Sequence, residues 1–74
     1  MNLESTIYVA LLNEGVDVWR PVQAEHVGNN VYQIIVQPYD RSVERWEFEP
    51  GTRVICENIQ SSEGIIYAAV RKAA

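Results

Sequence analysis

The chain consists of short runs of β-branched residues that glycine, asparagine, proline and serine interrupt at regular intervals. Ten valines and seven isoleucines stand against three leucines among its 74 residues. Branching at Cβ restricts χ1 and suits the pleated surface of a strand better than a helix. The sequence therefore predicts an all-β fold.

Turn residues divide the sequence into five or six expected strands. Apolar or alternating runs cover residues 7–12, 16–27, 31–37, 46–49, 52–59 and 64–72. Clusters such as Asn13-Glu14-Gly15, Gly28-Asn29-Asn30 and Pro50-Gly51 separate them, and Gly and Asn tolerate the left-handed backbone of tight turns. The spacing leaves no room for crossover helices and favours a small barrel or sandwich. We expect one domain, residues 1–74, and a five-stranded barrel, because closure removes most sheet edges.

Two segments depart from regular alternation. In the second run the even-numbered positions from 16 to 24 are otherwise apolar, but Arg20 is charged, and Pro21 lacks a backbone N–H donor. We therefore expect a bulge or a sheet edge there. The polar segment 39–45 indicates a loop, in which Asp40 could cap a single helical turn.

The core of so short a chain is thin, so self-association would be a reasonable further source of stability. A single core in so short a chain rarely supplies more than about 3–5 kcal/mol. The last run is apolar on both faces, and one face with a free strand edge would suit a subunit contact. The residues expected there are Ile65, Ile66, Tyr67, Ala68 and Val70. The alternative is a central strand that the N-terminal segment shields.

The charge balance disfavours nucleic acids and membranes as partners. Ten acidic residues against six basic ones give a formal charge of −4, and the longest basic run is Arg71-Lys72. A basic stripe, the usual footprint of phosphate binding, is missing, as is a basic amphipathic helix. The longest apolar run, Ile7 to Leu12, is far shorter than the roughly 20 residues that a membrane helix needs. One cysteine and a start without a signal-peptide pattern indicate the cytoplasm.

Three sequence stretches carry a resemblance to a known family. Asp17-Val18-Trp19-Arg20-Pro21-Val22, Gly28-Asn29-Asn30-Val31-Tyr32 and Trp46-Glu47-Phe48-Glu49-Pro50-Gly51-Thr52-Arg53-Val54 together resemble a family of short, uncharacterised bacterial proteins. The resemblance extends from about Tyr8 to Val70 and implies an SH3-like or Sm-like barrel, with no assigned activity. The RNA-binding signatures of Sm proteins and the Ala-Leu-Tyr-Asp-Tyr signature of SH3 domains are both missing from this sequence.

Catalytic and metal sites find little support in the sequence. His26 and Cys56 are the only imidazole and thiol, so a nucleophilic pair would have to use both. A structural role explains each of them, because Cys56 stands where a small hydrophobic residue is expected. Zinc needs three or four ligands of these types, so we expect no metal and no cofactor. Glu47 and Glu49 alternate with Trp46 and Phe48, which is typical of a solvated outer face.

Aromatic residues next to acidic ones are the best candidates for a binding surface. Such a surface would suit a basic or proline-containing peptide. The candidate ligand-facing residues are Trp19, Tyr39, Trp46, Glu47 and Glu49. Trp46 could instead pack in the core, because aromatic rings supply large buried area. Trp19 alternates with apolar residues and shares its face with polar ones, so it is the better candidate for an exposed ring.

The sequence thus favours a non-enzymatic binding module that forms homo-oligomers. An RNA-binding barrel is the alternative, in which Trp19 or Tyr39 would stack on bases and Arg41, Arg45 and Arg53 would supply charge. An enzyme that uses His26 or the glutamates ranks last.

Overall fold

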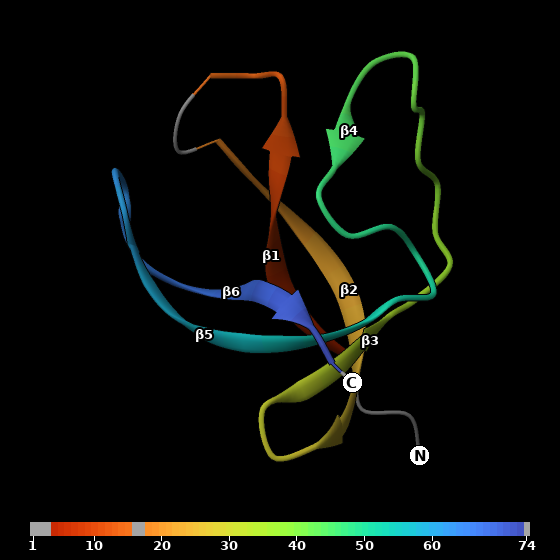
Figure 1. Ribbon diagram of the computed structural model, residues 1–74, viewed down its shortest axis with the longest axis vertical. Coiled ribbons are helices and arrows are strands. Elements are labelled where there is room, and N and C mark those ends of the chain that lie inside the picture. Colours follow the sequence, from red (N-terminus) through yellow and green to blue (C-terminus); the bar gives the residue numbers. More distant parts are fainter. Residues whose placement is uncertain (1–3, 16–17, 74) are drawn as a thin grey trace.

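The expected all-β fold is confirmed by the computed structural model, which describes residues 4–15 and 18–73. Within these residues there are six strands and no helix (Figure 1). The strands are β1 (Glu4–Leu12), β2 (Trp19–Gly28), β3 (Val31–Ile34), β4 (Arg45–Trp46), β5 (Arg53–Ser61) and β6 (Gly64–Lys72). Val16 and Asp17, which begin the second predicted run, lie outside the described residues, as do positions 1–3 and 74.

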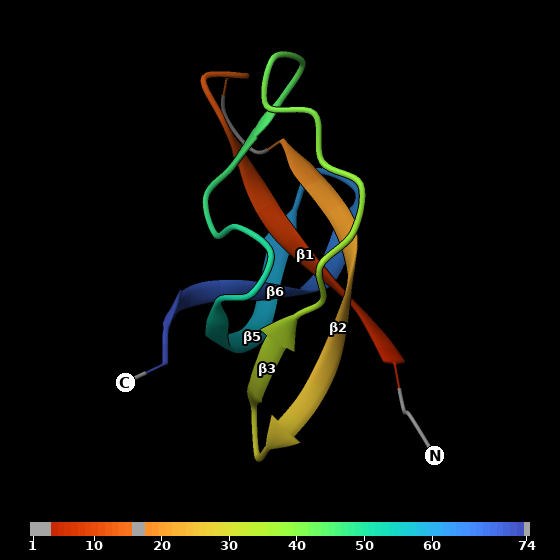
Figure 2. The same ribbon diagram turned by 90° about the vertical axis from the view of Figure 1, so that its right-hand side faces the viewer.

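Five of the strands form a closed ring. β1, β2, β3, β5 and β6 pair as antiparallel neighbours in that order, and β6 returns to β1 in parallel through Tyr8 and Ala68. Strand direction cannot alternate around a ring with an odd number of members, so one neighbouring pair must be parallel. Figure 2 shows β1 and β6 crossing at this junction. The structure therefore has the small, barrel-like architecture that the strand spacing predicts.

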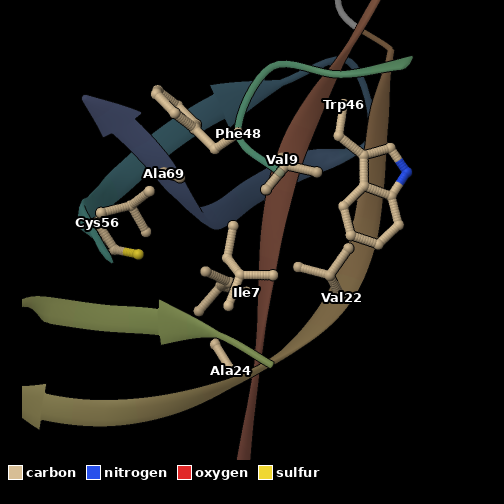
Figure 3. Close-up of a cluster of buried hydrophobic side chains, with 10 residues drawn as sticks. Ile7, Val9, Val22, Ala24, Trp46, Phe48, Cys56 and Ala69 are labelled. Atoms are coloured by element: carbon tan, nitrogen blue, oxygen red, sulfur yellow. The ribbon is translucent and has the colours of Figure 1, made fainter. Parts of the chain in front are cut away.

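The core fills this ring. Its buried apolar side chains come from every strand and from the segment after β4: Ile7, Val9, Val22, Ala24, Ile34, Trp46, Phe48, Val54, Cys56 and Ala69 (Figure 3). Alternation explains the set, because successive side chains of a strand point to opposite faces. Trp46 and Phe48 are buried while Glu47 and Glu49 are exposed, as their alternation predicts. Only Arg45 and Trp46 pair as a strand in that segment, with Leu12 and Leu11 of β1.

The predicted turns lie where the glycines and asparagines indicate. Asn13 and Asn29 have φ of 63° and 47°, in the left-handed region that asparagine tolerates. Gly51 has φ 93°, and the Thr52 amide donates to the Glu49 carbonyl oxygen at 3.1 Å. Proline followed by a glycine of positive φ is the sequence of a type II turn, so Pro50-Gly51 directs the chain into β5.

Arg20 and Pro21 lie at a sheet edge, as predicted, but the predicted bulge is not there. These residues pair in regular register with Val9 and Tyr8 of β1, whereas β3 pairs with β2 only from Ala24 onward. The register shift in β2 lies between His26 and Gly28. A bulge depends on how the partner strand turns, which the parity of one strand does not reveal.

The open edge of β2 is protected by the side chain of Gln37. Its Oε1 accepts from the Gln23 amide at 3.1 Å, and its Nε2 donates to the carbonyl oxygens of Gln23 and Ile35 at 3.0 and 2.6 Å. Backbone groups two residues apart point to the same side of a strand, so the nitrogen of Pro21 faces this edge too. Proline thus removes a donor from the edge and leaves the pairing with β1 intact.

The third predicted run is shorter than its alternation indicates. β3 ends at Ile34, and Val36 is 82% exposed instead of continuing the apolar face of Tyr32 and Ile34. The following loop contains the expected turn at Asp40, whose carbonyl oxygen accepts from the amides of Val43 and Glu44, each at 3.0 Å. One turn forms there and no helix follows.

The predicted subunit interface on β6 needs correction. β6 has no free edge at Ala68, because that residue pairs with Glu57 of β5 and Tyr8 of β1, and its side chain is fully buried. Tyr67 packs against the core and lies edge-on to Tyr32, with ring centroids 5.6 Å apart. The alternative of a central strand shielded by the N-terminal segment is the one that the structure shows.

Four of the five predicted interface residues keep some exposure. Ile65 is 69% exposed near the start of β6, and Ile66, Tyr67 and Val70 are partly exposed. A register shift between Ile55 and Cys56 leaves Val70 without a direct partner on β5.

Candidate functional site

A surface groove of about 670 Å³ lies between the start of β2 and the loop before β4. It is lined by Arg20, Pro38, Tyr39, Asp40, Arg41, Val43 and Glu44. Val43 is 69% exposed, so an apolar side chain stands in the open beside charged ones. Concave surfaces that combine apolar side chains with a few polar groups are typical binding sites.

The Tyr39 ring is fixed in the groove by Trp46. The two rings stack at a centroid distance of 4.4 Å and an interplanar angle of 20°. The Trp46 amide also donates to the Tyr39 hydroxyl oxygen at 2.7 Å. Trp46 is itself held by the pairing of β4 with β1, so Tyr39 rests on the barrel core.

Ion pairs neutralise most of the charge around the groove. Arg20 Nε lies 3.2 Å from Glu44 Oε1, which also accepts from the Trp46 indole nitrogen at 2.7 Å. Arg41 Nε donates to Glu49 Oε2 at 3.0 Å. The hydrogen bond between Arg41 and Glu49 lowers the pKa of the Glu49 carboxyl and raises that of the Arg41 guanidinium.

The Asp40 carboxylate is used within its own turn. Its Oδ1 accepts from the Ser42 hydroxyl at 2.6 Å and from the Ser42 amide at 2.9 Å. The Ser42 hydroxyl is the main reason that the pKa of Asp40 is lowered. Asp40 therefore shapes the rim of the groove, and its oxygen already has two donors.

The structure brings together three of the five predicted ligand-facing residues. Tyr39 and Trp46 stack, and Glu49 joins them through Arg41, which bonds to Glu49 and lies over the Tyr39 ring. Trp46 is only 3% exposed and lies beneath Tyr39. The prediction that Trp46 faces a ligand is therefore wrong, because its indole ring is buried in the core. Glu47 is exposed, and its backbone amide donates to Ala10 of β1 at 2.8 Å.

Trp19 belongs to a different part of the surface. It lines a smaller hollow of about 270 Å³ together with Tyr8, Ser61, Ser62, Glu63, Ile65 and Ile66. Trp19 thus lies beside two of the predicted interface residues and apart from the Tyr39 groove.

Sequence reasoning missed Arg20, Glu44 and Val43 as parts of the groove. The available signal was Arg20 itself, a charged residue at a position where its run is otherwise apolar, because its guanidinium reaches Glu44. Nothing in the sequence pairs these two residues, since they come from different elements.

His26 and Cys56 have separate structural roles. His26 Nε2 donates to the Asn29 carbonyl oxygen at 2.6 Å, and the ring lies 4.9 Å from that of Tyr32. Cys56 is 1% exposed, and burial raises the pKa of its thiol to about 11. A thiol with this pKa stays protonated at neutral pH, whereas a nucleophilic cysteine needs the thiolate.

No group of three or more His, Cys, Asp or Glu side chains within residues 4–15 and 18–73 is arranged to hold a metal ion. The same residues contain no helix that is long and apolar enough to cross a membrane.

Comparisons with known proteins return no match to a family model, a curated protein or a solved structure. The resemblance to a family of short bacterial proteins therefore stays a prediction.

Proposed function

We propose that this protein is a non-enzymatic binding module that takes a short, extended, proline-containing segment of a partner protein into the Tyr39 groove. The observation that carries the proposal is the aromatic ring of Tyr39, fixed by Trp46 and flanked by the exposed Val43. Side chains that are already immobilised lose little entropy on binding. The proposal includes a cytoplasmic location and membership of the SH3-like or Sm-like class of small barrels.

The edge beside the groove favours a polyproline-type ligand over an added β-strand. Strand addition needs free backbone donors and acceptors. At this edge Pro21 has no N–H, and both backbone groups of Gln23 bond to Gln37. A polyproline II segment needs no ladder of hydrogen bonds and docks through its ring faces on aromatic side chains.

Selection from a random peptide library displayed on phage tests this proposal. We expect enriched peptides that contain proline and bind the purified protein, with binding lost in Val43→Ser. Val36→Ser is the matched control, because Val36 is also an exposed valine, at 82% against 69% for Val43, but does not line the groove. A library that yields no binder, or binders that Val43→Ser leaves unaffected, would contradict the proposal.

We further propose that the protein forms homo-oligomers through the hollow beside Trp19. The support is the exposed Ile65 at the rim of a hollow that Tyr8, Trp19 and Ile66 also line. Sedimentation should give a mass above one protomer, and Ile65→Ser should lower it while Val36→Ser does not. A single-protomer mass at high concentration rules the oligomer out.

The RNA-binding alternative has weaker support from the same surface. Arg41 pairs with Glu49, and Arg53 Nε donates to Gln33 at 3.3 Å, so both guanidiniums already have protein partners. Retention of single-stranded RNA at low salt, lost as salt rises, would favour this alternative.

A further inference from the structure

The outer face of the Tyr39 ring is occupied by a side chain of the same loop. The guanidinium carbon of Arg41 lies over the ring, 4.7 Å from its centroid. An aromatic ring has two faces, and Trp46 stacks on one of them at 4.4 Å. Arg41 therefore covers the other face, which is the face that a ligand in the groove would use.

Arg41 is held there only by exposed contacts. Its Nε donates to Glu49 at 3.0 Å, and both side chains are more than half exposed. Exposed ion pairs and exposed cation–π contacts each contribute little, so such a side chain exchanges readily.

The ring and the carboxylate together form a site for a planar cation. A guanidinium stacks on an aromatic face and offers several donors to a carboxylate, which an ammonium cannot do in the same way. Segment 38–49 carries four carboxylates, from Asp40, Glu44, Glu47 and Glu49, and the two guanidiniums of Arg41 and Arg45. Arg20 adds a third guanidinium through its ion pair with Glu44, so one net negative charge remains. A positively charged ligand is therefore favoured at this loop.

We propose that Tyr39 and Glu49 form a subsite for an arginine side chain of the partner, which Arg41 fills until the partner displaces it. This inference rests on the proposed peptide-binding function and names the side chain that the groove selects. The partner has the advantage over Arg41 because its flanking residues also contact Pro38 and Val43.

Two blocked pentapeptides test this subsite, Pro-Pro-Arg-Pro-Pro and its citrulline counterpart, in which a neutral urea replaces the guanidinium. Affinities come from chemical-shift titration of the labelled full chain. We expect the arginine peptide to bind more tightly than the citrulline peptide. Arg41→Gln should improve the affinity for the arginine peptide about three- to tenfold, because it removes the internal competitor. Glu49→Gln should weaken binding.

Arg45→Gln is the matched control, because it removes the same charge from the nearby start of β4 without uncovering the ring. Equal gains for Arg41→Gln and Arg45→Gln would reduce the effect to net charge and overturn the inference. A second readout is the Arg41 side-chain resonances, which the Tyr39 ring current should shift upfield in the free protein. They should return toward ordinary positions when the arginine peptide binds.

The two proposals fail in different ways. The arginine subsite is overturned if both peptides bind with equal affinity, or if Arg41→Gln does not improve the affinity for the arginine peptide. It is also overturned if the arginine peptide binds neither the wild type nor Arg41→Gln. The library selection with Val43→Ser and Val36→Ser decides the proposed function separately, because it assumes no particular ligand side chain.

Discussion

The Tyr39 hydroxyl oxygen accepts a hydrogen bond from the Trp46 backbone amide at 2.7 Å while the two rings stack. This pair joins the loop that forms the groove to the strand that closes one end of the barrel. The shape of the groove and the stability of the core therefore depend on the same contact.

Tyr39→Phe should keep the stacking and remove this hydrogen bond. We expect a loss of about 1 kcal/mol in the free energy of unfolding, because the Trp46 amide loses its acceptor. Urea denaturation followed by tryptophan fluorescence measures the change. Tyr8→Phe is the control, since the described part of the chain gives no hydrogen-bond partner to the Tyr8 hydroxyl. Equal effects of the two substitutions would contradict the role assigned to Tyr39.

Gln37→Glu should weaken the protection of the β2 edge, where the Gln23 carbonyl oxygen would keep only the Ile35 amide as its donor. A carboxylate can still accept from the Gln23 amide, but it cannot donate to the carbonyl oxygens of Gln23 and Ile35. We expect a loss of about 1–2 kcal/mol in stability and an increase in aggregation at high concentration. Gln33→Glu should be nearly neutral, because Gln33 only accepts, from Arg53. Unfolding curves and light scattering test the pair, and unchanged aggregation of Gln37→Glu would count against the protective role.

Val54→Ala should destabilise the barrel strongly, because Val54 is completely buried. Loss of two methyl groups and the resulting cavity should cost about 2–3 kcal/mol. That is a large share of the roughly 3–5 kcal/mol that a core of this size supplies. Val36→Ala removes the same atoms from a side chain that is 82% exposed and should change stability by less than about 0.5 kcal/mol. Thermal unfolding distinguishes them, and similar midpoints would show that β5 does not line the core.

Stability should fall as the pH rises from about 9 to 11. Burial raises the pKa of Cys56 from an ordinary value of 9.0 to about 11, so the unfolded chain releases this proton first. The stabilisation is complete below pH 9 and is lost as the pH approaches 11, with a total of roughly 3 kcal/mol at 1.36 kcal/mol per pKa unit. Burial also raises the pKa of Tyr67, which adds to the decrease.

Cys56→Ala is the control for this pH dependence. It should lower stability at pH 7 and flatten the decline above pH 9, with the Tyr67 contribution remaining. An unchanged slope in Cys56→Ala would contradict the assignment to the thiol.

The sequence predicts those features of the fold that local chemistry determines. Turns at Asn13, Asn29 and Gly51 follow from the backbone freedom of these residue types, and the opposite placement of Phe48 and Glu49 follows from alternation. The all-β fold class and the five strands of the ring follow from the same turn residues and the same alternation.

The parts that the sequence did not predict depend on distant neighbours. The run from Ile65 to Val70 is apolar on both faces, so alternation alone could not show that Ala68 is buried while Ile65 is exposed. The pairing of β6 with β1 decides that outcome. The groove likewise depends on a contact between Arg20 and Glu44, which no local pattern encodes.

The parallel contact between β1 and β6 also affects how the chain can fold. Tyr8 and Ala68 are 60 residues apart in the sequence, so the part of β1 around Tyr8 gains this partner only after β6 has been synthesised. Closure between such distant segments costs much chain entropy and slows folding. On the ribosome, the edge of β1 around Tyr8 would remain a template for mispairing until β6 emerges.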